Sequence, residues 1–288
     1  MSEYLVFTDS CCDVSPELLQ QWGVPYANMT FSFDGEDKAY TEADITNDEF
    51  YNRMRQGACA KTAAINAATF TDAFEAILKE GKDILYVAFS SGLSTTVNSA
   101  HIAADELKET YPDRKIVIVD TLAASAGEGL MVYLAVEKKK EGATLEENAA
   151  YLEALIPNHC IWFTVDDLEY LKRGGRVSAL AALAGGLLGV KPVLKMDIEG
   201  HLIKDFTVRG RKKAIEALAD KYGELHDPEN LGPVFISHAQ CEDEAMKLVN
   251  MFKERFGVEV TLLTKIGPVI GAHAGPGTIA LFFLGKHR

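Results

Sequence analysis

Positive charge is scarce in this 288-residue chain, where 29 lysine and arginine residues stand against 42 acidic ones and leave a formal net charge of −13. An acidic surplus of this size repels phosphate backbones and anionic membrane surfaces at long range. We therefore do not expect nucleic acid as a partner. A local basic cluster can still receive an anion, because screening limits the reach of the overall field.

Cysteine is also scarce, with five residues, no Cys-x-x-Cys pair and no spacing typical of zinc ligands. This pattern argues against a disulfide scaffold and against a metal site. The first residues lack the basic region and the small-residue cleavage site of a secretory signal. The expected location is therefore the cytoplasm.

Long hydrophobic runs are nearly absent, and the longest uncharged stretch lies at 266–285. Its length would suit a membrane span, but five glycines, two prolines and His273 interrupt it. This composition favours a glycine-rich loop followed by a buried strand at 278–284. We expect no transmembrane segment, so that any contact with a membrane would be transient.

The remaining composition, 48% hydrophobic and 25% charged, is that of an ordinary globular protein. Continuous apolar runs at 4–8, 83–89 and 115–119 alternate with amphipathic stretches. Strands buried on both faces of a parallel sheet require such runs. The first half is therefore predicted to be an α/β domain with a doubly wound parallel sheet.

The pattern changes after a helix at about 145–156, which ends before Pro157. Strand-like runs then lie closer together and mix with helices, with a helix at 167–173 and strands near 191–195, 202–208, 234–239 and 258–264. This mixture predicts an α+β domain with a mixed or partly antiparallel sheet. We expect an N-terminal domain over 1–157 and a C-terminal domain over 158–288.

An acidic stretch at 34–49 carries seven acidic side chains against Lys38 alone. It has few periodic apolar positions and no EF-hand spacing. We therefore interpret it as a solvated loop without a metal ion.

The loop Ser90-Ser91-Gly92-Leu93-Ser94 follows a predicted parallel strand, at the edge where α/β proteins collect ligands. Gly92 permits close backbone approach, and Ser94 with the two threonines after it would open a helix. Hydroxyls and free N–H groups at a helix N-terminus suit an anion. The alternative is that Ser94 serves only as a helix cap.

Four other segments are ambiguous when each is taken singly. Thr62 lies in a predicted loop before a helix that begins near Thr69, and Arg176 follows two glycines after a short helix. Arg209 belongs to a basic cluster at a strand-to-helix junction, and the flexible backbone around His273 indicates close approach to a ligand.

Taken together, in order and spacing over nearly the whole chain, these segments resemble the DegV family. The matching motifs are Thr8-Asp9-Ser10, Lys61-Thr62, Ser90 through Ser94, Leu168 through Arg176, Lys191-Pro192, Arg209, and Gly267 through Gly277. The sequence departs from the family pattern at Ala63-Ala64 and at Thr95. The resemblance implies a two-domain DegV-like α/β fold that binds a long-chain fatty acid as its ligand, without a cofactor.

In the family, hydroxyls at the positions of Thr62 and Ser94 hold the fatty acid carboxylate, and the acyl chain lies in an apolar tunnel. The resemblance extends the predicted fatty-acid-binding set to Ser91, Gly92 and His273. It also implies that a separate ATP-dependent fatty acid kinase converts the carried acid to an acyl phosphate for phospholipid synthesis. Arg176 and Arg209 would serve that transfer or the partner surface, so that this chain is a carrier and not an enzyme.

Two enzymatic alternatives are weaker. A serine hydrolase would use Ser94 as nucleophile and His273 as base, oriented by Asp9 or Asp120, but the second glycine of the GxSxG elbow is missing. A nucleotide-dependent enzyme would need GxGxxG or GxxxxGK[ST], and neither stands between a strand and a helix here. A binding protein that any lipid fills by chance is the third alternative.

Overall fold

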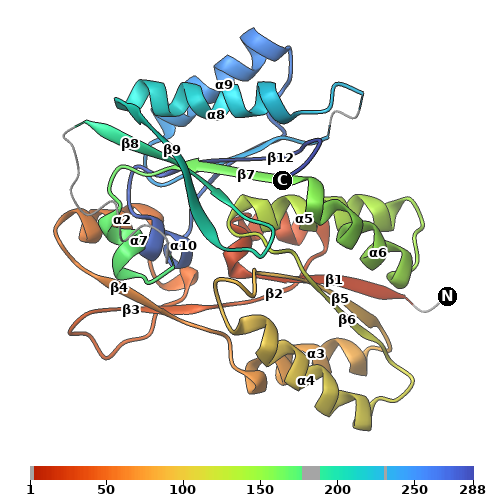
Figure 1. Cartoon of the computed structure of the whole chain (residues 1–288). Helices are drawn as coiled ribbons and strands as arrows, with labels where there is room; N and C mark the ends of the chain where they lie inside the picture. The colour runs from red at the N-terminus through yellow and green to blue at the C-terminus, as the bar shows by residue number, and fades with distance from the viewer. Residues whose placement is uncertain (1–2, 177–188, 230–231) are drawn as a thin grey trace.

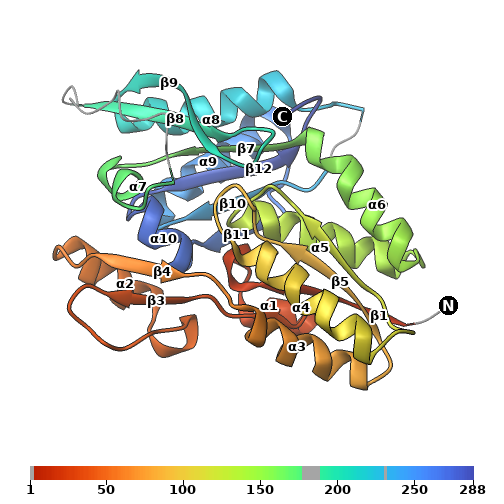
Figure 2. The ribbon, with the colours of Figure 1, turned by 60° about the horizontal axis from the view of Figure 1, so that its bottom comes forward.

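The computed structural model describes residues 3–176, 189–229 and 232–288, and its helices and strands form five stacked layers (Figure 1). Two large sheets are separated by a layer of helices, and each sheet is covered by further helices on its outer face (Figure 2).

The first large sheet has four parallel strands in the order β2-β1-β5-β6. They are β1 (Tyr4–Asp9), β2 (Tyr26–Ala27), β5 (Asp83–Ala88) and β6 (Ile116–Asp120). Helices α3 (Ala67–Lys79) and α4 (Thr96–Thr110) cover one face, and α5 (Ala126–Lys140) and α6 (Leu145–Leu155) cover the other. The predicted doubly wound parallel sheet is confirmed.

The second large sheet has six strands in the order β11-β10-β12-β7-β8-β9, and only β10 and β11 run parallel. They are β7 (His159–Thr164), β8 (Val190–Met196), β9 (Leu202–Arg209), β10 (Phe235–His238), β11 (Leu262–Lys265) and β12 (Ile279–Leu284). Helices α8 (Arg211–Leu225) and α9 (Glu242–Phe256) cover its outer face. The predicted mixed sheet is confirmed, although the strand expected from 258 begins only at Leu262.

A third, two-stranded sheet was not predicted. It pairs β3 (Thr30–Phe33) with β4 (Ala60–Ala63) and packs with α2 (Asn47–Arg55) around an aromatic cluster. Thr62 therefore lies on a strand and not in a loop, while α3 begins at Ala67 behind the Asn66 cap. The short strand escaped prediction because its burial alternates over only four residues.

The prediction of a glycine-rich loop before the last strand is also wrong, because residues Pro268–Ala274 form helix α10. Pro268 occupies the first turn, where its missing N–H costs nothing. Gly271 is needed for packing, since a Cβ there would collide with the Tyr51 hydroxyl. The glycine at this position therefore indicates close packing of a helix. The predicted strand that follows is confirmed as β12.

Helix α5 packs against both large sheets. A Cβ at Gly127 would lie 2.8 Å from the Phe282 ring of β12, and one at Gly129 would lie 2.7 Å from the Cys12 carbonyl beyond β1. One apolar cluster contains residues of both halves, such as Phe7 and Phe163. The chain passes from the first sheet to the second at 156–158, and the division into two domains there stays a prediction.

No helix in the described ranges is long and apolar enough to cross a membrane. The remaining short elements are α1 (Pro16–Trp22), α7 (Glu169–Arg173) and three 3-10 turns at Ser10–Cys12, Glu42–Asp44 and Ile156–Asn158. Most of the acidic stretch at 34–49 is exposed, as expected, but it is not a loop throughout, because it includes the 3-10 turn at Glu42–Asp44 and the start of α2. Glu42 turns inward.

Buried carboxyl groups gather beyond the end of β1. Asp9 accepts a 2.6 Å hydrogen bond from the Tyr86 hydroxyl, Asp13 accepts one of 2.8 Å from the Gly267 amide, and Glu128 accepts one of 2.8 Å from Thr8. Burial raises the pKa of all three carboxyls. Burial, with a smaller effect from Asp9, raises the pKa of Glu42 to about 7.

These raised values predict a loss of stability as the pH rises. A carboxyl that holds its proton more tightly in the folded state stabilises the fold fully below its unfolded pKa, about 4.3 for glutamate, and less as the pH passes the folded value. We expect the free energy of unfolding, measured by urea titration, to fall between pH 5 and pH 8. Glu42→Gln should flatten this fall, and an unchanged slope would contradict the assignment.

Candidate ligand-binding cavity

A narrow cavity of about 80 Å³ lies between the two large sheets. Most of its wall is apolar, formed by Met29, Phe89, Leu93, Ala124, Ile161, Phe163, Leu171, Met196, Leu202, Ile266, Val269, Ile270, Ala274, Ala280 and Phe282. An unbranched hydrocarbon chain matches a space that is slender and apolar.

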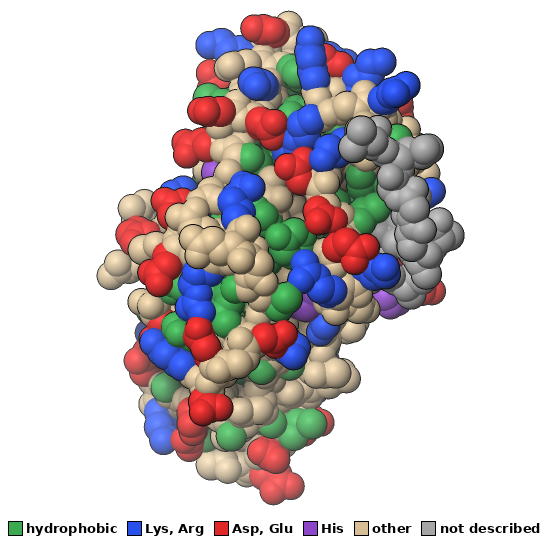
Figure 3. Space-filling model, turned by 90° about the vertical axis from the view of Figure 1, so that its left-hand side faces the viewer, with side chains coloured by type: hydrophobic (Ala, Val, Ile, Leu, Met, Phe, Trp, Pro, Cys, Tyr) green, Lys and Arg blue, Asp and Glu red, His purple; other side chains and the backbone are tan. Residues whose placement is uncertain are grey.

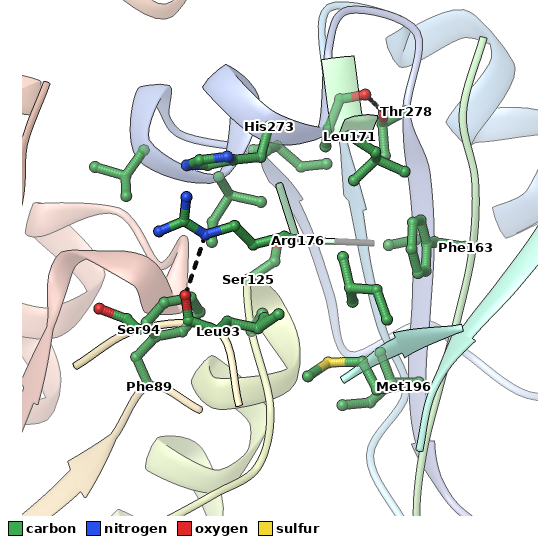
Figure 4. A pocket seen from close by; sticks show the side chains of 18 of the residues that line it. Phe89, Leu93, Ser94, Ser125, Phe163, Leu171, Arg176, Met196, His273 and Thr278 are labelled. Carbon is green, nitrogen blue, oxygen red and sulfur yellow. Dashed lines mark hydrogen bonds between the residues drawn. The ribbon is translucent and has the colours of Figure 1, made fainter. Parts of the chain in front are cut away.

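Polar side chains gather at one end of this cavity. Figure 4 shows His273, Arg176 and Ser94 on one side, whereas Phe163 and Met196 lie on the other. Thr62 belongs to the polar end because its hydroxyl lies 2.9 Å from His273 Nε2. The sequence analysis singled out all four residues, with Thr62, Ser94 and His273 expected to bind the fatty acid and Arg176 expected to serve transfer or the partner surface. The fold brings them together from β4, α10, the segment after α7 and the loop before α4.

His273 is a neutral group in this position. Burial is the main cause that lowers its pKa, with the nearby Arg176 guanidinium adding to it, and the value falls to about 4. Its Nδ1 atom is buried and has no hydrogen-bond partner among the described residues. Gly174 is a glycine because a Cβ there would collide with this ring.

Ser94 lies just before helix α4, and its side chain faces both the helix and the cavity. Its Oγ accepts a 3.2 Å hydrogen bond from the Thr96 amide and lies 2.8 Å from the Thr96 hydroxyl. Thr95, and not Ser94, is the N-cap residue of α4. Ser94 nevertheless accepts from the first-turn amide of Thr96, and it also lines the cavity, so that it does not serve the helix alone.

Arg176 lies at the polar end with its guanidinium tied to backbone oxygens. Its Nε donates to the Leu93 carbonyl at 3.2 Å, and a terminal nitrogen donates to the Gly174 carbonyl at 2.7 Å. These bonds leave further N–H groups for an anion.

The polar end continues into a surface cleft that shares Thr62, Arg176 and His273 with the cavity. Lys61 and Arg173 line the outer part of this cleft. Figure 3 shows the face that lies on the left in Figure 1, where acidic and basic side chains alternate and hydrophobic ones lie between them. A head group in the cavity would therefore lie close to the surface.

Two predicted residues of the Ser90–Ser94 loop do not line the cavity. Ser91 is exposed, and its amide donates to Asp120 Oδ1 at 3.2 Å. A Cβ at Gly92 would lie 2.7 Å from the carbonyls of Glu199 and Gly200. The close approach that this glycine permits is to the turn between β8 and β9.

Arg209 likewise does not line the cavity. It is the exposed last residue of β9, where its backbone pairs with Val190. The structure therefore separates the two arginines that the resemblance assigned to one role, since only Arg176 lines the cavity.

Sequence reasoning missed two polar residues of the wall, Ser125 and Thr278. Ser125 has a φ of 57° at the start of α5, and its hydroxyl bonds to Asp13 and lies 3.0 Å from Ser237 Oγ. Thr278 lies 2.9 Å from the carbonyl oxygen of Ala274. A hydroxyl already engaged with the protein presents little polarity to a ligand, and no local motif marks either position.

The geometry does not support a serine hydrolase. Ser94 bonds to Thr96 and His273 bonds to Thr62, so that no hydrogen bond joins nucleophile to base in the described part of the chain. Asp9 is engaged with Tyr86, and Asp120 accepts from the Ser91 and Leu122 amides. Within the described ranges, no group of three histidine, cysteine or acidic residues is arranged to hold a metal ion.

The fold and the site thus define a two-sheet α/β protein with a slender apolar cavity that is polar at one end. A family profile described as "Uncharacterised protein, DegV family" matches residues 3–286. The chain belongs to the DegV family, as the motifs predicted. A DegV domain-containing protein of Clostridium perfringens is 40% identical over 289 residues, covering 100% of this chain and 99% of the relative.

Solved structures agree with this assignment. A fatty-acid-binding DegV family protein from Thermus thermophilus is 32% identical with a TM-score of 0.87, covering 99% of this chain and 100% of that one. A stearic acid-binding protein from Eubacterium ventriosum is 29% identical with a TM-score of 0.89, covering 98% of each chain.

The lowered pKa of His273 can be tested directly. We expect its ring to titrate near pH 4 in NMR spectra of the ligand-free protein, well below the ordinary value of about 6.5. Arg176→Gln should raise the pKa, because it removes a neighbouring positive charge. Titration of His273 near 6.5 in the wild type would contradict the buried, neutral assignment.

Proposed function

We propose that this protein binds one long-chain fatty acid, with the acyl chain in the apolar cavity and the carboxylate between Thr62, Ser94, His273 and Arg176. The observation that carries this proposal is the division of one slender cavity into an apolar length and a polar end. The fatty acids bound by the Thermus thermophilus and Eubacterium ventriosum proteins support it.

The two parts of the ligand make different contributions to binding. Burial of an acyl chain is worth about 0.8 kcal/mol per CH₂, or roughly 11 kcal/mol for fourteen methylenes before ordering costs. A carboxylate resists leaving water unless donors receive it, and hydroxyls with a guanidinium provide them. The tail supplies the affinity, and the head group sets the orientation.

The same site suits a carrier that presents the carboxylate to another protein. The head group lies where the cavity meets the surface cleft, and Arg176 stands at that junction. We propose that a cytoplasmic ATP-dependent fatty acid kinase phosphorylates the carried acid there, as a step toward phospholipid synthesis. Arg209, exposed at the end of β9, would contact that partner.

Loss of either head-group hydroxyl should weaken binding. Ser94→Ala and Thr62→Ala each remove a donor to a charged acceptor, which costs roughly 1.5–3 kcal/mol, or about 10- to 150-fold in Kd. Calorimetric titration with palmitate measures this change. The exposed neighbour Thr95→Ala is the matched control and should bind as the wild type does. Unchanged affinity in both cavity variants would place the head group elsewhere.

The role of the basic residues needs a separate assay. A purified fatty acid kinase, ATP, palmitate and this protein are combined, and acyl phosphate is measured as its hydroxamate. At a palmitate concentration that saturates every variant, we expect Arg209→Ala and His273→Ala to lower the rate at least tenfold. Exposed Lys204→Ala on the same strand as Arg209 should leave the rate unchanged. Wild-type rates in both variants would defeat the assignment of these residues and leave the carrier proposal standing.

A further inference from the structure

Thr96 is a fully buried polar residue that does not belong to the proposed head-group site. Thr96 has no exposed surface and lies in the first turn of α4. It does not line the cavity, yet its amide and its hydroxyl lie 3.2 Å and 2.8 Å from Ser94 Oγ. One buried residue therefore contacts the same oxygen twice.

The direction of the hydrogens decides what Ser94 can offer a ligand. A serine hydroxyl has one hydrogen to donate and two lone pairs that accept. If Ser94 donates to Thr96, only a lone pair remains for the cavity, and it repels a carboxylate. If Thr96 donates to Ser94, both lone pairs are filled from Thr96, and the Ser94 hydrogen is left for the ligand.

The surroundings favour the second arrangement once a carboxylate is present. Among the described residues, the other acceptor for the Thr96 hydrogen is the Met29 sulfur, 3.9 Å away, and a thioether is a weak acceptor. A carboxylate, by contrast, is a strong acceptor for the Ser94 hydrogen. Successive hydrogen bonds that point the same way also strengthen one another in a low-dielectric site.

We propose that Thr96 is a positioning residue that directs the Ser94 hydroxyl hydrogen into the cavity and so selects a carboxylate over an uncharged head group. The proposal rests on the proposed function, because it needs a fatty acid with its head group at Ser94. It adds a second layer to that site, since the selecting group never touches the ligand.

The test compares palmitate with hexadecanol, which has the same number of carbons. A carboxylate only accepts hydrogen bonds, whereas an alcohol both donates and accepts and so tolerates Ser94 in either direction. We expect Thr96→Val to weaken palmitate binding about fivefold, which corresponds to about 1 kcal/mol of binding free energy, because the Ser94 hydrogen is then no longer directed at the carboxylate. Hexadecanol binding should change less than twofold. Thr96→Ser should restore palmitate binding, and Thr95→Val should leave both ligands unaffected.

Other results distinguish a failure of the Thr96 proposal from a failure of the proposed function. Equal weakening of both ligands in Thr96→Val would show a packing role and overturn the proposal, and so would unchanged palmitate binding or failure of Thr96→Ser to restore it. In those cases the wild type still binds palmitate and the proposed function stands. A wild type that binds neither ligand would instead defeat the proposed function.

Discussion

Close packing of helix α5 between the two large sheets is the constraint on which the cavity depends. Gly127 lets the helix approach the Phe282 ring on one side, and Gly129 lets it approach the Cys12 carbonyl on the other. A side chain at Gly127 would push β12 away and one at Gly129 would push away the turn that follows β1, because protein interiors have no spare room at these distances. The spacing of the sheets in turn brings Thr62 and Ser94 of the first half toward Arg176 and His273 of the second.

Charge is distributed so that an anion can be held within a chain of net charge −13. The buried carboxyls beyond β1 have raised pKa values, which favours their neutral forms. His273 is neutral as well, so Arg176 provides the positive charge within the wall, and hydroxyls provide neutral donors. This balance suits a single carboxylate better than a dianion, because the described part of the wall holds no further cation to pair with a second negative charge.

Much of the fold was predictable because burial leaves a local pattern. The runs at 4–8, 83–89 and 115–119 became β1, β5 and β6, since strands covered on both faces need continuous apolar residues. Glycine was the main source of error. From the sequence, Gly92 suggests close approach to a ligand and Gly271 a loop, but both glycines permit packing against segments distant in sequence.

The polar end of the site was predictable and the apolar wall was not. Thr62, Ser94, Arg176 and His273 belong to motifs with a recognisable order, whereas Phe163 or Met196 would look the same in an ordinary core. Thr96 could not be found either, because its role depends on a neighbour's hydrogen and not on residue type.

The central claim, that the cavity holds one fatty acid, is tested most directly by native mass spectrometry of the protein as purified from cells. The account predicts a mass increment of one long-chain fatty acid, which organic extraction removes and added palmitate restores. A protein that is purified empty and takes up neither palmitate nor oleate would contradict it.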